Sequence, residues 1–194
     1  MYIGNLWLSS DFVDVEGSII ECGVWKGGMI AGMAELFGNR KKYFLFDSFK
    51  GLPLAKEIDG NSASNWQNDT EGNTYFGNCS ADITFATKIM DETKVDYKIY
   101  EGWFSETLPE FNTADPIAIL RLDGDWYEST YDCLRYLFPK VSYNGLIIID
   151  DYAAWEGCSK AVHDYLSEIK SVSKIRMSTG GIYYIVKKDE CFSS

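Results

Sequence analysis

Three aspartates follow two apolar runs near the middle of the chain. Asp123 comes directly after the run 117–122, and Asp150 and Asp151 come directly after the run 146–149. Short apolar runs that end at turn residues are typical of buried strands, and strands that are apolar on both faces suit a parallel sheet. Neighbouring parallel strands lie about 4.8 Å apart. The three carboxylates are therefore predicted to meet at the carboxyl edge of a sheet, where open α/β sheets bind ligands.

Carboxylates that lie so close together repel one another, so either some of them hold protons or a cation lies among them. Ligand sets made only of oxygen favour a hard divalent ion such as magnesium. The alternative is that these aspartates only end strands and begin turns, and Asp123-Gly124 is a good turn pair. Because three aspartates follow two consecutive strands, the position at the ligand-binding edge favours a magnesium site.

A crossover must join the two strands if their ends are to meet at one edge. Residues 129–139 have the apolar spacing of a helix, and Ser129 with Asp132 three positions later is a candidate capping box. Asn144-Gly145 then returns the chain to the second strand. This segment predicts a strand, a helix and a parallel strand joined by a right-handed crossover.

An earlier strand, 18–22, leads into a glycine-rich turn and a helix over 29–37, and a second strand, 43–46, ends at Asp47. A glycine-rich turn with an acidic residue about 20 positions later fits either a nicotinamide cofactor or S-adenosylmethionine. A dinucleotide pyrophosphate needs G-x-G-x-x-G, but Trp25 occupies the place of the second glycine. No G-K-[ST] follows, which excludes a Walker loop. The turn therefore favours S-adenosylmethionine.

The rest of the chain alternates between helices and strands around one long polar segment. Residues 51–81, which we name the lid segment, are rich in turn residues, and long loops of this kind are usually lids or binding loops. The first seventeen residues are expected to form a short helix or an extended arm. The other expected elements are a helix over 83–92, a strand over 97–100, a ligand-edge loop over 152–155, a helix over 158–169, and an antiparallel hairpin of strands over 172–177 and 181–186.

Composition narrows the classes of partner. The chain has 194 residues, which we predict to form a single domain over 1–194, and a net charge of −11. Nucleic acids and anionic membrane surfaces attract proteins through Lys and Arg side chains, so we expect neither as a partner of this acidic chain. The five cysteines are scattered without a CxxC pair, so neither a zinc site nor a disulfide framework is indicated. No signal peptide or long apolar span is evident, and we expect a cytoplasmic protein.

His163 is the single histidine of the chain and lies in the helix expected over 158–169. One histidine cannot form a histidine-based metal cluster. It either packs on the helix surface, which we favour, or acts as a base that reaches into the site.

Four blocks of sequence stand out over residues 18–187. They are IIECGVWKGG, FDSFKGLP, EGWFSETLP and LRLDGDWYEST…FPKVSYNGLIIIDDY…AVHDY. Together they resemble the macrocin O-methyltransferase family, whose members methylate sugar hydroxyls during the assembly of macrolide and aminocoumarin antibiotics. The resemblance implies a class I methyltransferase (Rossmann-like) fold of the α/β class. In this fold, helices cover both faces of a mostly parallel seven-stranded sheet with an antiparallel last strand. It also implies S-adenosylmethionine as the methyl donor and a magnesium ion (Mg2+).

The resemblance assigns roles by position to residues of this chain. It places the metal on Asp123, Asp150 and Asp151, and it gives Asp123 as the general base. In our own hypothesis for the mechanism, His163 is the less favoured base. The residues that it assigns to the cofactor are Glu21, Gly23 and Trp25 around the methionine part, Asp47 and Ser48 at the ribose, and Gly102 and Trp103 near the adenine.

The sequence thus predicts transfer of a methyl group to a hydroxyl of a small molecule, with a sugar or glycosylated metabolite favoured. The alternatives are a catechol-type O-methyltransferase, a nicotinamide-dependent oxidoreductase of the same fold class, and a non-catalytic binding module. Family members carry a longer N-terminal region that helps to cover the active site, whereas fewer than twenty residues precede the first expected strand here. We therefore expect the cover to come from the lid segment, from residues 152–155 or from a second subunit, which leaves a homo-oligomer open.

Overall fold

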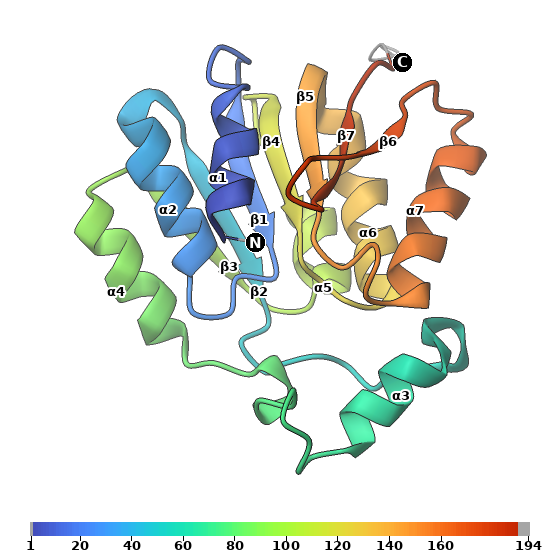
Figure 1. Ribbon diagram of the computed structural model, residues 1–194. Helices are drawn as coiled ribbons and strands as arrows, with labels where there is room; N and C mark the ends of the chain where they lie inside the picture. The colour runs from blue at the N-terminus through green and yellow to red at the C-terminus, as the bar shows by residue number, and fades with distance from the viewer. Residues whose placement is uncertain (1, 190–194) are drawn as a thin grey trace.

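Seven strands form one sheet in the computed structural model, which describes residues 2–189. Their order is β3-β2-β1-β4-β5-β7-β6, and Figure 1 shows helices on both faces of this sheet. The strands are β1 (Ser18–Cys22), β2 (Tyr43–Asp47), β3 (Tyr97–Glu101), β4 (Ile117–Leu122), β5 (Val141–Ile149), β6 (Ile175–Met177) and β7 (Tyr183–Val186). The α-helices are α1 (Tyr2–Ser10), α2 (Gly28–Phe37), α3 (Gly60–Asn68), α4 (Ile83–Thr93), α5 (Phe104–Glu110), α6 (Tyr127–Leu137) and α7 (Glu156–Glu168). Short 3-10 helices are η1 (Gly38–Arg40), η2 (Glu57–Asp59), η3 (Gly77–Cys79) and η4 (Phe138–Lys140).

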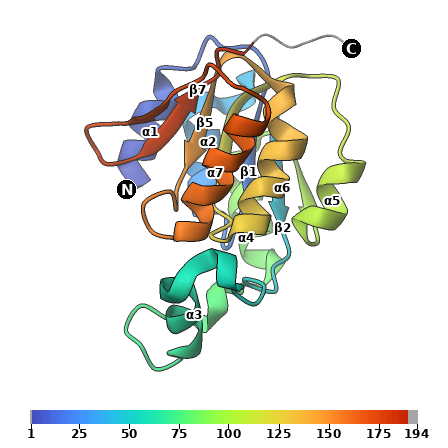
Figure 2. The ribbon, with the colours of Figure 1, turned by 90° about the vertical axis from the view of Figure 1, so that its right-hand side faces the viewer.

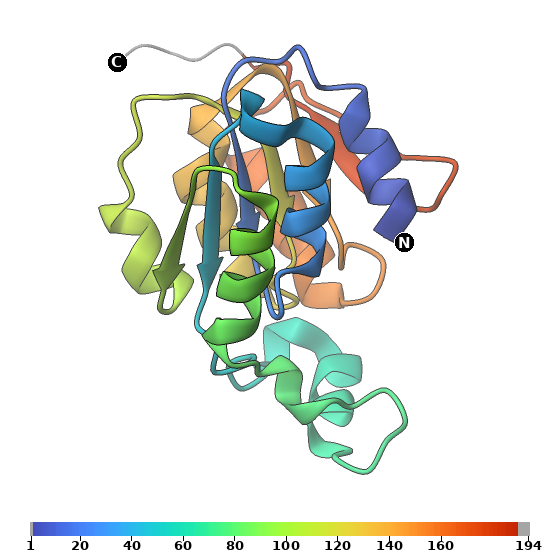
Figure 3. The same cartoon turned by 90° about the vertical axis from the view of Figure 1, so that its left-hand side faces the viewer.

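Each face of the sheet holds its own apolar core. Helices α5, α6 and α7 cover one face (Figure 2), and α1, α2 and α4 cover the other (Figure 3). Side chains alternate between the two cores along each strand, as in β1, where Ile20 belongs to the first core and Ile19 to the second. Strand β4 is buried along its full length. The continuous apolar runs of the central strands predict this two-sided burial.

The strand pairings confirm the predicted mixed sheet. Strands β1 to β5 pair in parallel, whereas β7 runs antiparallel to both β5 and β6. The hairpin strands are shorter than the expected 172–177 and 181–186. The backbone N–H of Val172 donates to the carboxylate of Asp189 instead of to a neighbouring strand, and β6 begins later.

Helix α6 begins two residues before the predicted start. Its first residue is Tyr127, so the expected capping box of Ser129 and Asp132 is wrong. The helix start is capped from the lid segment, because the backbone N–H of Tyr127 donates to Oδ1 of Asp59 at 2.7 Å. Asp59 is buried and lies 68 positions earlier in the chain. No sequence pattern near the start of α6 predicts a cap from a residue so far away in the chain.

The lid segment is more structured than a polar loop. It contains η2, α3 and η3, and Figure 1 shows it beyond the carboxyl ends of the parallel strands. Helix α3 is polar and buries only Ala63, so it has no apolar stripe of its own to stabilise it. Its Trp66 supplies the packing, with ring centroids 5.9 Å from Trp155 and 6.3 Å from Trp126.

Helix α5 is a further element that we did not predict from the sequence. It begins at Phe104, directly after Trp103. Phe104 packs against the core on the face of the sheet that α5, α6 and α7 cover. Within the part of the chain that the structure describes, no helix is long and apolar enough to cross a membrane. The cysteines in this part are free thiols, and Cys191 lies outside the described residues.

Candidate active site

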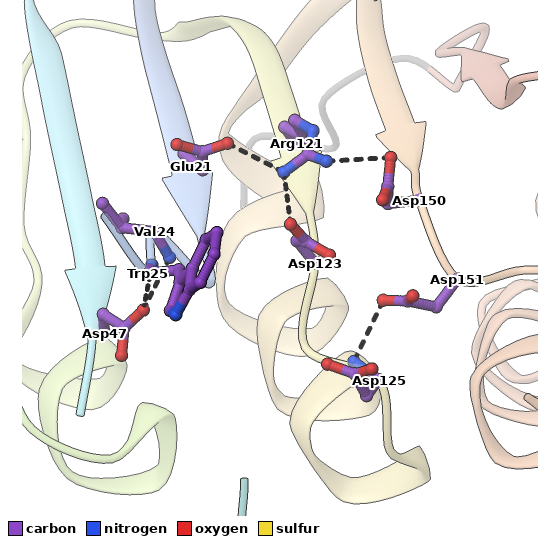
Figure 4. A network of polar contacts seen from close by, with 9 residues as sticks. All are labelled: Glu21, Val24, Trp25, Asp47, Arg121, Asp123, Asp125, Asp150 and Asp151. Atoms are coloured by element: carbon purple, nitrogen blue, oxygen red, sulfur yellow. Dashed lines mark hydrogen bonds and ion pairs between the residues drawn. The ribbon is translucent and has the colours of Figure 1, made fainter. Parts of the chain in front are cut away.

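The carboxyl ends of β4 and β5 lie side by side, as the sequence predicts. Leu122 at the end of β4 pairs with Ile149 at the end of β5, and the amide of Asp150 donates to the carbonyl of Leu122 at 2.9 Å. Asp123, Asp150 and Asp151 therefore stand at one edge of the sheet (Figure 4).

A buried arginine lies beneath these carboxylates. Nη1 of Arg121 lies 2.8 Å from Oε1 of Glu21 and 2.6 Å from Oδ2 of Asp123, and Nη2 lies 2.8 Å from Oδ1 of Asp150. Burial opposes the charge of the guanidinium, but Asp123 and Glu21 outweigh it and raise the pKa of Arg121 above its usual value. Our reading of the sequence gave this residue no role. The sequence feature that could have revealed its role is a single charged residue inside an apolar strand, because such residues are rarely buried unless they are paired.

A fourth aspartate, Asp125, belongs to the cluster that forms at this edge. Carboxylate oxygens of Asp123, Asp125 and Asp151 lie within 4.8 Å of one another, whereas Asp150 forms its ion pair instead. The backbone N–H of Asp125 donates to Oδ2 of Asp151 at 3.2 Å, and its Oδ1 accepts the indole N–H of Trp155 at 2.9 Å. The second aspartate of LDGD was the available signal for this residue, since it follows the predicted edge residue by two positions.

Burial and mutual repulsion make Asp125 and Asp151 reluctant to ionise. Burial and the charge of Asp123 raise the pKa of Asp125 to about 7. Burial and the charges of Asp125 and Asp123 raise the pKa of Asp151 well above its usual value. A divalent cation would reverse both shifts, because it stabilises the ionised forms. The donor set fits magnesium, since it consists only of oxygen. Two ligands of one magnesium ion lie at most about 4.2 Å apart, and these oxygens already lie within 4.8 Å of one another.

Asp47, the last residue of β2, holds the glycine-rich turn in place. Its Oδ2 accepts the backbone N–H groups of Val24 and Trp25, each at 2.7 Å, and its Oδ1 accepts the N–H of Phe49 at 2.6 Å. These bonds stabilise the left-handed backbone of Trp25, whose φ is 49°. Asp47 thus supports the turn, and it also lines the cavity beside the turn.

A cavity of about 580 Å³ lies between the turn, the aspartates and the lid segment. Its size is typical of a small-molecule site. Every site residue that the sequence predicts lines this cavity except Glu21 and His163. The predicted residues in the lining are Gly23, Trp25, Asp47, Ser48, Gly102, Trp103, Asp123, Asp150 and Asp151. Asp125 also lines it, and the lid segment adds Gly51, Leu52, Pro53, Phe76 and Cys79.

Glu21 and His163 lie elsewhere. Glu21 is 1% exposed and forms an ion pair with Arg121 within the sheet. Burial raises the pKa of Glu21 to about 8, against the opposing effect of Arg121. His163 lies on α7, where its Nε2 is 2.8 Å from the hydroxyl of Tyr152 at the protein surface. His163 is thus not among the residues that line the cavity.

The two ends of the lid segment are joined at its base. The amide of Leu52 donates to the carbonyl of Asn78 at 3.0 Å, and the side chain of Asn78 donates back to the carbonyl of Leu52 at 2.7 Å. Near this base, the ring centroid of Phe76 lies 5.7 Å from that of Trp25 in the glycine-rich turn. The lid segment therefore contacts the turn as well as the helices on the other side of the cavity.

Several known proteins are similar to this chain. The family model described as Macrocin-O-methyltransferase (TylF) matches residues 10–184. A demethyldecarbamoylnovobiocin O-methyltransferase from Streptomyces niveus is 32% identical over 176 residues, which cover 88% of this chain and 66% of that protein. An 8-demethyl-8-(2,3-dimethoxy-alpha-L-rhamnosyl)-tetracenomycin-C 4'-O-methyltransferase from Streptomyces olivaceus is 33% identical over 165 residues, which cover 78% of this chain and 58% of that protein. The chain thus spans about two thirds or less of the length of these curated relatives.

A solved structure shows the same fold. The O-methyltransferase NovP matches this chain with a TM-score of 0.76 and 26% sequence identity, and the match covers 96% of this chain and 79% of NovP.

Proposed function

We propose, from the fact that this chain belongs to the macrocin O-methyltransferase family, that it transfers a methyl group from S-adenosylmethionine to a hydroxyl of a sugar or glycosylated small molecule. The observation that carries the proposal is the cluster of Asp123, Asp125 and Asp151 beside a cavity that also borders the glycine-rich turn. Residues 1–194 act as one domain in this proposal, with the lid segment as the cover of the site.

S-adenosylmethionine would supply a methyl group on a positively charged sulfur, which an oxygen nucleophile can attack. A carboxylate has about four acceptor sites, and Asp47 uses three of them for backbone N–H groups, so it retains capacity for one ribose hydroxyl. The lining residues proposed to hold the cofactor are Gly23 and Trp25 at the methionine part, Asp47 and Ser48 at the ribose, and Gly102 and Trp103 at the adenine.

The proposed magnesium ligands are Asp123, Asp150 and Asp151. Asp123 and Asp151 belong to the observed cluster. Asp150 is the ligand that the family resemblance adds, and to bind the ion it would give up its ion pair with Arg121. The ion would act as a Lewis acid that lowers the pKa of the acceptor hydroxyl, as metals do for bound water. Three carboxylates leave ligand positions for substrate oxygens, which suits a substrate with two adjacent hydroxyls.

Asp125 is the proposed proton acceptor. Methyl transfer to a hydroxyl releases a proton, and its acceptor must lie within hydrogen-bond reach of that hydroxyl. Asp125 lines the cavity, and because its Oδ1 accepts the indole N–H of Trp155, its other carboxylate oxygen is left for the proton. Asp123 is the base that the resemblance gives, but its Oδ2 is engaged in an ion pair with Nη1 of Arg121 at 2.6 Å. His163 lies outside the lining, so we assign the proton to Asp125.

A sugar is the proposed acceptor. The name of the Streptomyces olivaceus relative includes a rhamnosyl group, and the polar lid segment offers many hydrogen-bond partners for hydroxyls. A catechol also presents two adjacent hydroxyls, so it is the competing class of acceptor.

Labelled S-adenosylmethionine, offered with a panel of nucleotide sugars, glycosides and catechols, tests this proposal. We expect label in a sugar hydroxyl. Label only in catechols would overturn the sugar assignment and retain the methyl transfer. No label in any acceptor, together with a fluorescence change on adding NADH, would instead favour the nicotinamide-dependent alternative.

A further inference from the structure

The geometry points to Trp155 as a positioning residue that links the lid segment to Asp125. Trp155 directly precedes α7, its indole N–H donates to Asp125, and its ring packs against Trp66 of the lid segment. The inference rests on the proposed function, in which Asp125 accepts the proton. It adds that the docked lid helps to aim this carboxylate.

The first link is the hydrogen bond between Trp155 and Asp125, with Nε1 and Oδ1 2.9 Å apart. This distance is the usual one for an N–H···O hydrogen bond in proteins. The backbone of Asp125 is left-handed, with a φ of 57°, which residues other than glycine rarely adopt. Regular secondary structure therefore does not set the direction of this side chain. One oxygen is held by Trp155, and the direction of the other oxygen follows from that bond.

The second link is a cluster of three tryptophans. The ring centroid of Trp155 lies 5.2 Å from that of Trp126 and 5.9 Å from that of Trp66, both in edge-to-face arrangements. Aromatic pairs attract one another at such distances. Trp126 is 1% exposed, and its Nε1 donates to the carbonyl of Pro53 in the lid segment at 2.9 Å. Removal of the lid segment would expose Trp126 and release one face of Trp155.

The third link anchors the lid segment next to Trp155. Asp59 caps α6 through the amide of Tyr127, and a Cβ at Gly157 would lie 2.5 Å from Oδ1 of Asp59. The start of α7 thus fits against Asp59 without spare room. The contact that seats the lid segment also fixes the loop that carries Trp155, so the aim of Asp125 depends on lid docking.

Nitrogen-15 NMR of the indole N–H groups tests the two contacts of Trp155 without any methyl transfer. The chain has six tryptophans, and Trp155→Phe identifies the Trp155 signal by its loss while it keeps a ring against Trp66. We expect Asp125→Asn to shift this signal by replacing the carboxylate acceptor with an amide, and Trp66→Ala to shift it by removing the lid contact. Trp66→Leu keeps an apolar side chain and replaces the alanine variant if that variant does not fold.

Trp7→Phe is the matched control for these variants. Trp7 is 76% exposed on α1, so its replacement should remove one indole signal and leave that of Trp155 in place. A Trp155 signal that does not respond to Asp125→Asn, or that does not respond to the loss of Trp66, overturns the inference.

Steady-state kinetics with an acceptor from the panel supplies the functional readout. Trp155→Phe should lower kcat about 10- to 100-fold, because a misaimed catalytic group costs that much. The acceptor KM and the Kd for S-adenosylhomocysteine should stay within about twofold, as expected for a residue that acts only through Asp125. An unchanged kcat, or an equal loss of cofactor affinity, contradicts the positioning role. Indole signals that respond as expected in a chain that methylates no acceptor would refute the proposed function but not the link between Trp155 and Asp125.

Discussion

Nη2 of Arg121 lies 2.8 Å from Oδ1 of Asp150, so a proposed magnesium ligand is held by a buried guanidinium. The same guanidinium holds Asp123 at 2.6 Å and Glu21 at 2.8 Å. A permanent positive charge inside the sheet lets several carboxylates gather at one edge before any ion binds. Asp125 and Asp151 lie beyond its direct contacts, and the charge repulsion that remains between them is the part that a divalent ion would relieve.

Arg121→Gln should destabilise the chain strongly. The substitution removes the counter-ion of Asp123 and Asp150 and the hydrogen-bond partner of Glu21, and loss of one partner of a buried pair costs about 3–5 kcal/mol. Unfolding in urea at pH 7 measures the change in the free energy of unfolding. Lys56→Gln is the control, because its ion pair with Glu128 is exposed and such pairs contribute about 1 kcal/mol or less. A loss no larger in Arg121→Gln than in this control would show that the buried network does not stabilise the fold.

The metal-free chain should lose stability as the pH rises from about 5 to 8. Burial raises the pKa of Glu21 from 4.5 to about 8 and that of Asp125 from 3.8 to about 7, so within this window the folded state binds more protons than the unfolded state. The free energy of unfolding therefore falls as the pH rises, by at most about 1.4 kcal/mol per pH unit for each group. The stabilising protonation is complete below the unfolded pKa values and is lost as the pH passes the folded ones.

Urea unfolding in a buffer with chelator, repeated across this pH range, measures the effect. Glu21→Gln should reduce the slope, since glutamine does not titrate. A free energy of unfolding that rises with pH over the same range would be opposite to the expected sign.

The sheet and its carboxyl edge were predictable because their sequence signals are local. The run 117–122 has the bounds of β4, since burial on both faces leaves an uninterrupted apolar pattern. The contacts that shape the site are not local. Arg121 pairs with Glu21 across 100 positions, and Asp59 caps Tyr127 across 68 positions. Spacing also shows which residues reach the sheet edge, but it does not show which way each side chain turns once it is there.

The Asp47→Ala variant should bind S-adenosylhomocysteine more weakly by about 1.5–3 kcal/mol, the usual value of hydrogen bonds to a charged group. The change removes both the proposed ribose partner and the bonds that hold Val24 and Trp25 in the turn. Calorimetric titration measures the affinity. Asp115→Ala is the control, because Asp115 precedes β4 at its amino end and pairs with Lys42. Equal affinities for Asp47→Ala and the unchanged chain would remove Asp47 from the cofactor site.

Magnesium affinity should distinguish Asp151 from Asp125. Asp151→Asn removes a proposed ligand, so calorimetry should show magnesium binding weakened at least about 10-fold. Asp125→Asn removes the proposed proton acceptor, so magnesium binding should persist while kcat falls. If Asp125→Asn instead loses the ion, the observed cluster of Asp123, Asp125 and Asp151 holds the metal, and the proton acceptor must be reassigned.

Methyl transfer by this chain should require a metal ion and should go to a sugar hydroxyl. The transfer of label from S-adenosylmethionine to the best sugar acceptor tests both, measured first in chelator and then after magnesium is restored. We predict no transfer in chelator, full recovery with magnesium, and no recovery in Asp151→Asn under the same conditions. Transfer at the same rate with and without magnesium would contradict the account.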